Sequence, residues 1–171
     1  MVAATFQRDE EKVPEIDADA IETENTERAY QLLGGRRVIK HQVRTSLDAH
    51  DMIVNGISSQ ALVHLVDTVN FLSSGDALNK AIGMSLRTLQ RKKSDKGKGR
   101  LSAEYGSRAW RFAMILARAT TVLGDQDSAE SWMLAPAIGL DNRRPIDLLS
   151  SAVGAEAVED YLALMEYGGY T

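Results

Sequence analysis

The sequence predicts an all-α fold, in which a helical bundle with a helix-turn-helix is followed by a small helical C-terminal domain. Two observations support this prediction. Apolar residues recur at helical spacing along most of the chain, and no convincing strand pattern follows residue 45. In addition, the segment 76–93 has the pattern of two short helices that are joined by a glycine turn.

The overall composition is that of a globular protein. With 171 residues, of which 44% are hydrophobic, the chain can form one sizeable domain or two small ones. It contains no cysteine, which excludes disulfides, thiolate zinc sites and cysteine nucleophiles. The N-terminus lacks a basic region followed by an apolar stretch, and no run of about 18 apolar residues occurs. We therefore expect a soluble cytoplasmic protein without a membrane partner.

The N-terminal third has the least regular pattern. Residues 1–26 are polar and acidic with almost no apolar periodicity, so we expect a flexible acidic arm. A short helix is predicted over 26–33, ended by Gly34 and Gly35, and the segment 36–43 fits either a strand or a helical extension. A helix over 48–54 should end at Asn55-Gly56. Ser58 or Ser59 then begins a helix with the apolar residues Leu62, Leu65, Val66 and Val69.

The segment 76–93 predicts a helix-turn-helix. Leu78 and Ile82 lie four residues apart on its first helix, and Gly83 supplies the left-handed residue at which that helix ends. Ser85 can cap the second helix, on which Leu89 faces the core. The polar side chains of the second helix are then free to face outward, as a recognition helix in the major groove of DNA requires.

A loop and several further helices are predicted after this motif. The segment 94–100 reads as a basic, glycine-rich loop. A long helix should begin near Ser102 and end at Gly124, with an apolar stripe of Trp110, Ala113, Met114, Ala117 and Val122. Helices are also expected over 128–134, from Pro145, and over 155–167, with Gly154 separating the last two. We thus expect an arm over 1–26, a helix-turn-helix domain over 27–124 and a C-terminal domain over 125–171.

Charge is segregated along the chain. Residues 80–118 hold eleven basic and two acidic residues, a net charge of +9, whereas residues 1–30 carry −6 and residues 119–171 carry −7. Nucleic-acid binding depends on the local field, which is basic around the second helix of the motif. A merely solvated charged segment is the alternative.

The residue types of the second helix suit DNA recognition. Arginine, glutamine and serine near its start can read base edges, with Arg87 and Gln90 as the main base contacts, while later lysines meet phosphates. Because a single such motif buries too little surface for tight specific binding, we expect a homodimer or higher oligomer. The predicted DNA-binding residues are Ser85, Arg87, Thr88, Gln90, Arg91, Lys92, Lys93, Lys96, Lys98 and Arg100.

Two positions depart from the usual motif. Asn79 stands where a small residue normally lets the two helices approach, and Lys92 stands where an apolar residue often closes the core. An ordinary helical hairpin in a bundle therefore stays an alternative interpretation.

Signals for catalysis are weak. His41, His50 and His64 are not spaced as metal ligands, and none stands beside a candidate nucleophile. The glycine pairs lack the lysine and the preceding strand that phosphate-binding loops require. We expect no enzymatic activity, no metal and no cofactor.

The C-terminal motifs resemble those of a known family. Trp132-Met-Leu-Ala-Pro136, Pro145-Ile-Asp-Leu-Leu149 and Glu166-Tyr-Gly168 follow the helix-turn-helix in this order. With Arg87-Thr-Leu-Gln-Arg91, they resemble the Xre/MbcA/ParS-type antitoxins over roughly residues 50–171.

This resemblance implies a type II antitoxin that binds a NAD-destroying RES-domain toxin and represses its own operon by binding operator DNA. The final helix and tail, about 156–171, would obstruct the active site of the toxin. Its acidic charge and aromatic end suit a basic nucleotide-binding cleft. The predicted toxin-binding residues are Arg143, Arg144, Glu156, Glu159, Asp160, Glu166, Tyr167 and Tyr170.

Other functions stay open at this point. The chain could be a free-standing transcriptional regulator whose C-terminal domain only dimerises or senses a small ligand. A degenerate helix-turn-helix would instead leave a pure toxin inhibitor. The C-terminal helix could also simply close the fold or a homodimer interface.

Overall fold

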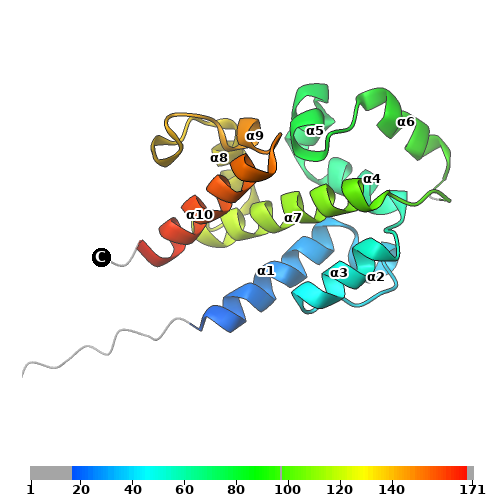
Figure 1. The fold of residues 1–171 in the computed structure, drawn as a ribbon, viewed down its shortest axis with the longest axis horizontal. Coiled ribbons are helices and arrows are strands. Elements are labelled where there is room, and N and C mark those ends of the chain that lie inside the picture. The colour runs from blue at the N-terminus through cyan, green and yellow to red at the C-terminus, as the bar shows by residue number, and fades with distance from the viewer. Residues whose placement is uncertain (1–16, 97, 169–171) are drawn as a thin grey trace, which may run out of the picture.

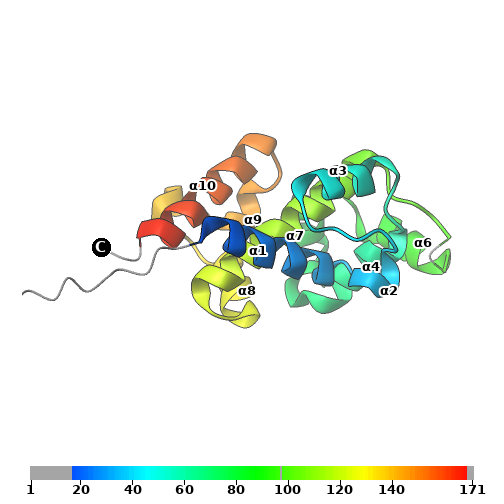
Figure 2. The same cartoon turned by 90° about the horizontal axis from the view of Figure 1, so that it is seen from below.

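The computed structural model describes residues 17–96 and 98–168, and these form ten α-helices and two 3₁₀-helices without a β-strand. The all-α prediction is therefore confirmed. Helix α7 (Ala103–Leu123) runs through the middle of the molecule, with α1 (Ala18–Leu32) along one side of it (Figure 1). The helix-turn-helix lies toward one end of α7, and the C-terminal helices lie toward the other (Figures 1 and 2).

The central helix α7 has the predicted ends but not the predicted buried stripe. Ser102 caps its start by accepting a hydrogen bond from the Tyr105 amide, and Gly124, with φ 99°, follows its end. Ala113 and Ala117 are buried as predicted, whereas Trp110, Met114 and Val122 are only partly buried. Neighbouring helices pack against α7 on several sides, so its fully buried large side chains are Phe112, Ile115 and Leu116.

Helix α1 begins earlier than the sequence predicted. The prediction of a flexible arm over 1–26 is wrong for residues 17–26, while residues 1–16 lie outside the described part of the chain. Asp17 caps the helix, and the Thr121 hydroxyl donates a hydrogen bond to the Asn25 side chain at 2.7 Å. Asn25 and Thr26 are both buried. The side of α1 that faces the core is polar here, which explains why apolar periodicity did not reveal it.

The next segment contains α2 (Gly35–Val38), α3 (Ser46–Val54), α4 (Ser59–Thr68) and the 3₁₀-helix η1 (Asn70–Ser73). Of the two alternatives for residues 36–43, the helical extension is correct for 36–38, and no strand follows. The predicted cap at Asn55-Gly56 and the predicted start at Ser58 and Ser59 are confirmed. Leu62, Leu65, Val66 and Val69 are buried as predicted.

The C-terminal part contains α8 (Gln126–Leu134), the 3₁₀-helix η2 (Ile138–Leu140), α9 (Pro145–Leu148) and α10 (Ala152–Gly168). Pro145 occupies the first turn of α9 as predicted. The prediction that Gly154 separates two helices is wrong, because this residue lies within α10. A Cβ atom at Gly154 would lie 2.1 Å from the Leu148 carbonyl oxygen, so the glycine permits close packing of α10 on α9.

Candidate functional site

Helices α5 (Gly75–Ile82) and α6 (Leu86–Ser94) form the predicted helix-turn-helix (Figure 1). Gly83 joins them with φ 77°, a left-handed conformation that favours glycine. A Cβ atom at this position would also lie 2.5 Å from the Arg108 guanidinium. The predicted core positions are all buried: Leu78, Ile82, Met84 and Leu89.

Packing of the motif does not depend on Asn79. This side chain is exposed, and the small residues that α5 buries are Ala77 and Ala81. Lys92 is partly buried on α6, so the second departure from the usual motif persists. Arg108 on α7 donates hydrogen bonds to the carbonyl oxygens of Lys80 at 2.9 Å and Ala81 at 3.4 Å, where α5 ends. A cation at a helix C-terminus is favourable, so α7 holds the motif in place.

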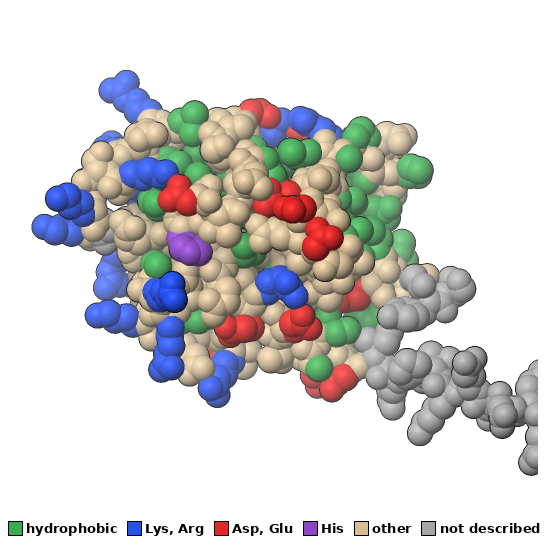
Figure 3. Space-filling model, turned by 180° about the vertical axis from the view of Figure 1, so that it is seen from behind, with side chains coloured by type: hydrophobic (Ala, Val, Ile, Leu, Met, Phe, Trp, Pro, Cys, Tyr) green, Lys and Arg blue, Asp and Glu red, His purple; other side chains and the backbone are tan. Residues whose placement is uncertain are grey.

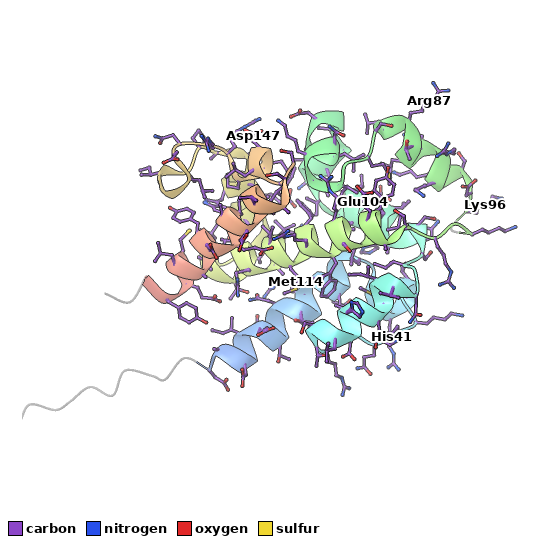
Figure 4. All side chains as sticks on the ribbon, viewed as in Figure 1. His41, Arg87, Lys96, Glu104, Met114 and Asp147 are labelled. Carbon is purple, nitrogen blue, oxygen red and sulfur yellow. The ribbon has the colours of Figure 1, made fainter. Side chains whose placement is uncertain are left out.

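The outward face of α6 presents Arg87, Gln90 and Arg91 to solvent. Within the described residues, none of these three side chains forms an ion pair or a side-chain hydrogen bond. Arg87 points away from the body of the molecule (Figure 4). These side chains are therefore available to contact base edges.

Ser85 and Thr88 hold the start of α6. The Ser85 hydroxyl oxygen accepts a hydrogen bond from the Thr88 amide at 3.2 Å and lies 3.1 Å from the Thr88 hydroxyl. Ser85 and Thr88 thus form the N-cap of α6.

The side chains predicted to contact phosphates differ in whether they already bind another group of the protein. Lys96 and Lys98 are exposed, and Lys96 extends into solvent at the end of the molecule (Figure 4). Lys93 forms an ion pair with Asp67 at 3.0 Å. The Arg100 guanidinium donates hydrogen bonds to the carbonyl oxygens of Asn55 at 2.7 Å and Gly56 at 3.0 Å. Arg100 therefore holds the loop against the end of α3.

An ion-pair cluster joins the motif to the C-terminal helices. The Asp147 carboxylate on α9 lies 2.6 Å from Lys80 Nζ on α5 and accepts hydrogen bonds at 2.8 Å from Arg144. Lys80 also contacts Asp76 at 2.8 Å. The hydrogen bonds from Arg144 and Lys80 lower the pKa of Asp147 from 3.8 to about 2. Arg144 is thus engaged within the fold.

Aromatic packing shapes the C-terminal helices. The rings of Trp132 on α8 and Tyr161 on α10 lie with centroids 6.4 Å apart and a tilt of 30°. Tyr161 also covers Gly139 of η2, where a Cβ atom would lie 2.1 Å from the ring. Tyr161 thus connects α10 to both α8 and η2.

An apolar surface lies exposed on the same helices, and of its residues only Tyr167 was predicted from sequence as a binding residue. Val153, Leu164 and Tyr167 on α10 are 77%, 68% and 54% exposed, and Ile138 of η2 is 86% exposed. Because 11 and 14 residues correspond to about three and four helical turns, Val153, Leu164 and Tyr167 share one face of α10. We name these four residues the α10 patch. The sequence feature that could have revealed this patch is the presence of apolar residues on more than one face of α10.

The predicted toxin-binding residues fall into two groups. Arg143, Glu156, Asp160 and Tyr167 are exposed, and Tyr170 lies outside the described residues. The others are engaged within the fold. Glu159 forms two hydrogen bonds with Arg111, at 2.7 and 3.3 Å, and the Glu166 side chain is 6% exposed and lies 3.6 Å from Arg118.

In the described part of the chain, His, Asp and Glu side chains form no group that could hold a metal ion. His64 Nδ1 lies 3.0 Å from the Leu32 carbonyl oxygen, in keeping with a structural role. No helix within the described ranges is long and apolar enough to cross a membrane.

Two family models match adjacent parts of this chain. Residues 48–114 match the antitoxin Xre-like helix-turn-helix domain, and residues 118–168 match the antitoxin Xre/MbcA/ParS C-terminal toxin-binding domain. Antitoxin Xre of Photorhabdus laumondii subsp. laumondii is 32% identical over 120 residues, which cover 67% of this chain and 79% of the relative. The chain belongs to the Xre antitoxin family. Antitoxin Xre of Yersinia enterocolitica is 28% identical over 123 residues, which cover 70% of this chain and 82% of that relative.

The two family models divide between the helix-turn-helix and the C-terminal helices that carry the α10 patch. The helix-turn-helix model includes α5 and α6, and the toxin-binding model includes α8, α9 and α10 with the α10 patch. Helix α7 is shared between the two matched regions, whereas α1 and α2 lie outside both. The family is thus that of a helix-turn-helix antitoxin of a toxin-antitoxin system.

Proposed function

We propose that this Xre antitoxin neutralises a RES-domain, NAD-degrading toxin through its C-terminal helices and represses its own operon through α6. The observation that carries the toxin half is the α10 patch, which exposes three apolar side chains on one face of a single helix. Large apolar side chains that are exposed on one helix face are typical of a protein interface.

Charge around the patch supports the same proposal. Glu156 and Asp160 are exposed on α10, and Asp160 lies on the same face as Val153, Leu164 and Tyr167. A helix face that combines exposed apolar and acidic side chains complements a cationic cleft that binds a dinucleotide. Binding there would block the entry of NAD, so the antitoxin would act by occupying the site, without catalysis of its own.

Operator binding rests on the free side chains of α6. Arg87 and Gln90 are exposed near the start of the recognition helix, where they can form paired hydrogen bonds with guanine and adenine edges. A cytoplasmic homodimer would present two such helices to repeated half-sites.

The toxin half is tested by calorimetric titration of the purified antitoxin into a purified RES-domain toxin. We expect Leu164→Asp to weaken binding by at least tenfold, because the substitution buries a charge in the interface. Leu47→Asp is the matched control, since Leu47 is equally exposed on the distant helix α3. Equal affinities for both variants would overturn the assignment of the α10 patch.

The DNA half is tested by fluorescence anisotropy with the upstream operator and a scrambled duplex. We expect the double variant Arg87→Ala/Gln90→Ala to lose most of the preference for the operator, because direct base contacts are removed. Arg143→Ala, which removes an exposed arginine far from α6, should leave that preference intact. A double variant that still prefers the operator would contradict the role of α6.

A further inference from the structure

A second basic surface lies outside both regions that match the family models. It consists of Arg36 and Arg37 of α2 and of Lys40 and Arg44 in the segment that follows, and we name it the α2 strip. All four side chains are exposed. The segment 31–47 contains no acidic residue, and within the described residues none of the four cations forms an ion pair.

The backbone that carries the α2 strip is fixed to the core. The Tyr30 hydroxyl donates toward the carbonyl oxygens of Ile39 at 2.8 Å and His41 at 3.0 Å, and the side chains of Ile39 and Val43 are buried. Burial raises the pKa of Tyr30, which keeps its hydroxyl protonated as a donor. The four cations therefore project from a defined position.

The α2 strip continues into the basic loop after the recognition helix. A surface hollow of about 440 Å³ is lined by Lys40 and His41 on one side and by Lys98 and Arg100 on the other. Hydrogen bonds from the Ser59 amide to the Gly99 carbonyl at 2.9 Å and from the Leu101 amide to the Ile57 carbonyl at 2.7 Å hold this loop in place.

The views of the molecule agree with this continuity. Helices α2 and α6 lie at the same end in Figures 1 and 2. In Figure 3, Lys and Arg side chains gather along that end, at the left of the view, while most Asp and Glu side chains lie farther from it. The basic surface thus extends well beyond α6.

We propose that the α2 strip binds the phosphate backbone of the DNA that flanks the site read by α6, and so lengthens the footprint of the antitoxin. This inference rests on the proposed operator binding. Long basic side chains that are exposed and have no carboxylate partner suit phosphates, which give affinity without sequence preference. A longer footprint also supplies part of the buried surface that a single helix-turn-helix lacks.

The test is a salt series of anisotropy titrations with the full chain on a long operator duplex and on a scrambled duplex of equal length. Each phosphate contact contributes roughly 0.9 to the slope of log affinity against log salt. For Arg36→Ala/Arg37→Ala/Lys40→Ala we expect the slope to fall by about 2 to 3 and the affinity to fall roughly tenfold on both duplexes. The ratio of operator to scrambled affinity should stay that of the wild type.

A charge-preserving variant and a thermal melt control for misfolding. Arg36→Lys/Arg37→Lys/Lys40→Arg should retain the wild-type slope, and all variants should melt near the wild-type temperature because the substituted side chains are exposed. Hydroxyl-radical footprinting should show loss of the outer protected phosphates in the alanine variant only. A wild-type slope and footprint in the alanine variant would overturn the inference. Failure of the proposed operator binding would give a different result, because the wild-type protein itself would then bind the operator and the scrambled duplex equally.

Discussion

At the scale of single residues, Asp147 links the two functional regions most directly. Its carboxylate contacts Lys80 of the helix-turn-helix and Arg144 of the C-terminal helices. These two cations favour the ionised form and hold the pKa of Asp147 near 2, below the ordinary 3.8. Because the pKa is lower in the folded state, the contribution to stability is fully present above about pH 4 and is lost as pH falls through about 2.

This linkage predicts a pH-dependent effect of Asp147→Asn. At pH 7 the variant should lose about 1 kcal/mol of unfolding free energy, a value reduced for the partial exposure of the pair. Denaturant titrations between pH 7 and pH 2 measure the difference, which should shrink below about pH 4. A difference that stays constant over this range would contradict a role for the charge.

Gly154 shows that a glycine can permit contact as well as end a helix. The residue is buried within α10, and its missing side chain lets the helix approach the Leu148 carbonyl. From sequence, a glycine between two helical segments is interpreted as a break, because the residue type does not show that its backbone packs against the turn that precedes the helix.

We therefore predict that Gly154→Ala destabilises the fold by about 1 to 3 kcal/mol, through overpacking against a backbone atom that cannot move aside. Gly168→Ala in the same helix is the control, since no other described element comes within 4 Å of its added Cβ. Thermal melts compare the two. If both variants melt at the wild-type temperature, the prediction that an added Cβ at this position overpacks against α9 is contradicted.

At the scale of elements, helices with clear ends were predictable from sequence. Ser85, Ser102 and Pro145 stand at the starts of their helices, and Gly83 and Gly124 follow the ends of theirs. These signals depend on local hydrogen bonds, which the sequence records directly. The first half of α1 was missed because its core-facing residues are Asn25 and Thr26, which are polar.

The candidate sites also contain features that were predictable from local sequence and features that were not. Recognition-helix residues were predictable because the motif fixes their orientation. Apart from Tyr167, the residues of the α10 patch were not predicted from sequence. The ion pairs of Glu159 with Arg111 and of Glu166 with Arg118 were not predicted either, because they depend on how α10 packs against α7.

The early start of α1 leads to a stability prediction. The Asp17 carboxylate accepts a hydrogen bond from the Ala20 amide at 3.2 Å, so Asp17→Ala should cost about 1 kcal/mol of unfolding free energy as a lost N-cap. Asp19→Ala removes the same charge from the first turn without removing the cap, and should cost less. Equal losses in urea titrations would contradict a helix start at residue 18.

At the scale of the whole molecule, the proposed DNA-binding helix α6 and the C-terminal end of α10, which carries part of the proposed toxin-binding surface, lie toward opposite ends of α7. Basic side chains gather at the end that carries α6 and α2 (Figure 3), and the C-terminal end of α10 lies toward the other end (Figure 1). This separation predicts that the antitoxin binds toxin and operator at the same time. Analytical ultracentrifugation of the three components should show a single complex larger than either pair, and mutual exclusion of toxin and DNA would contradict the separation.

The toxin-neutralising function is tested most directly by the rate at which the purified neighbouring toxin consumes NAD, measured while the antitoxin is titrated in. We predict that wild-type antitoxin and Leu47→Asp stop NAD loss near stoichiometric amounts, and that Leu164→Asp requires a large excess. Undiminished NAD loss in excess wild-type antitoxin would contradict the proposal that this chain blocks a NAD-degrading toxin.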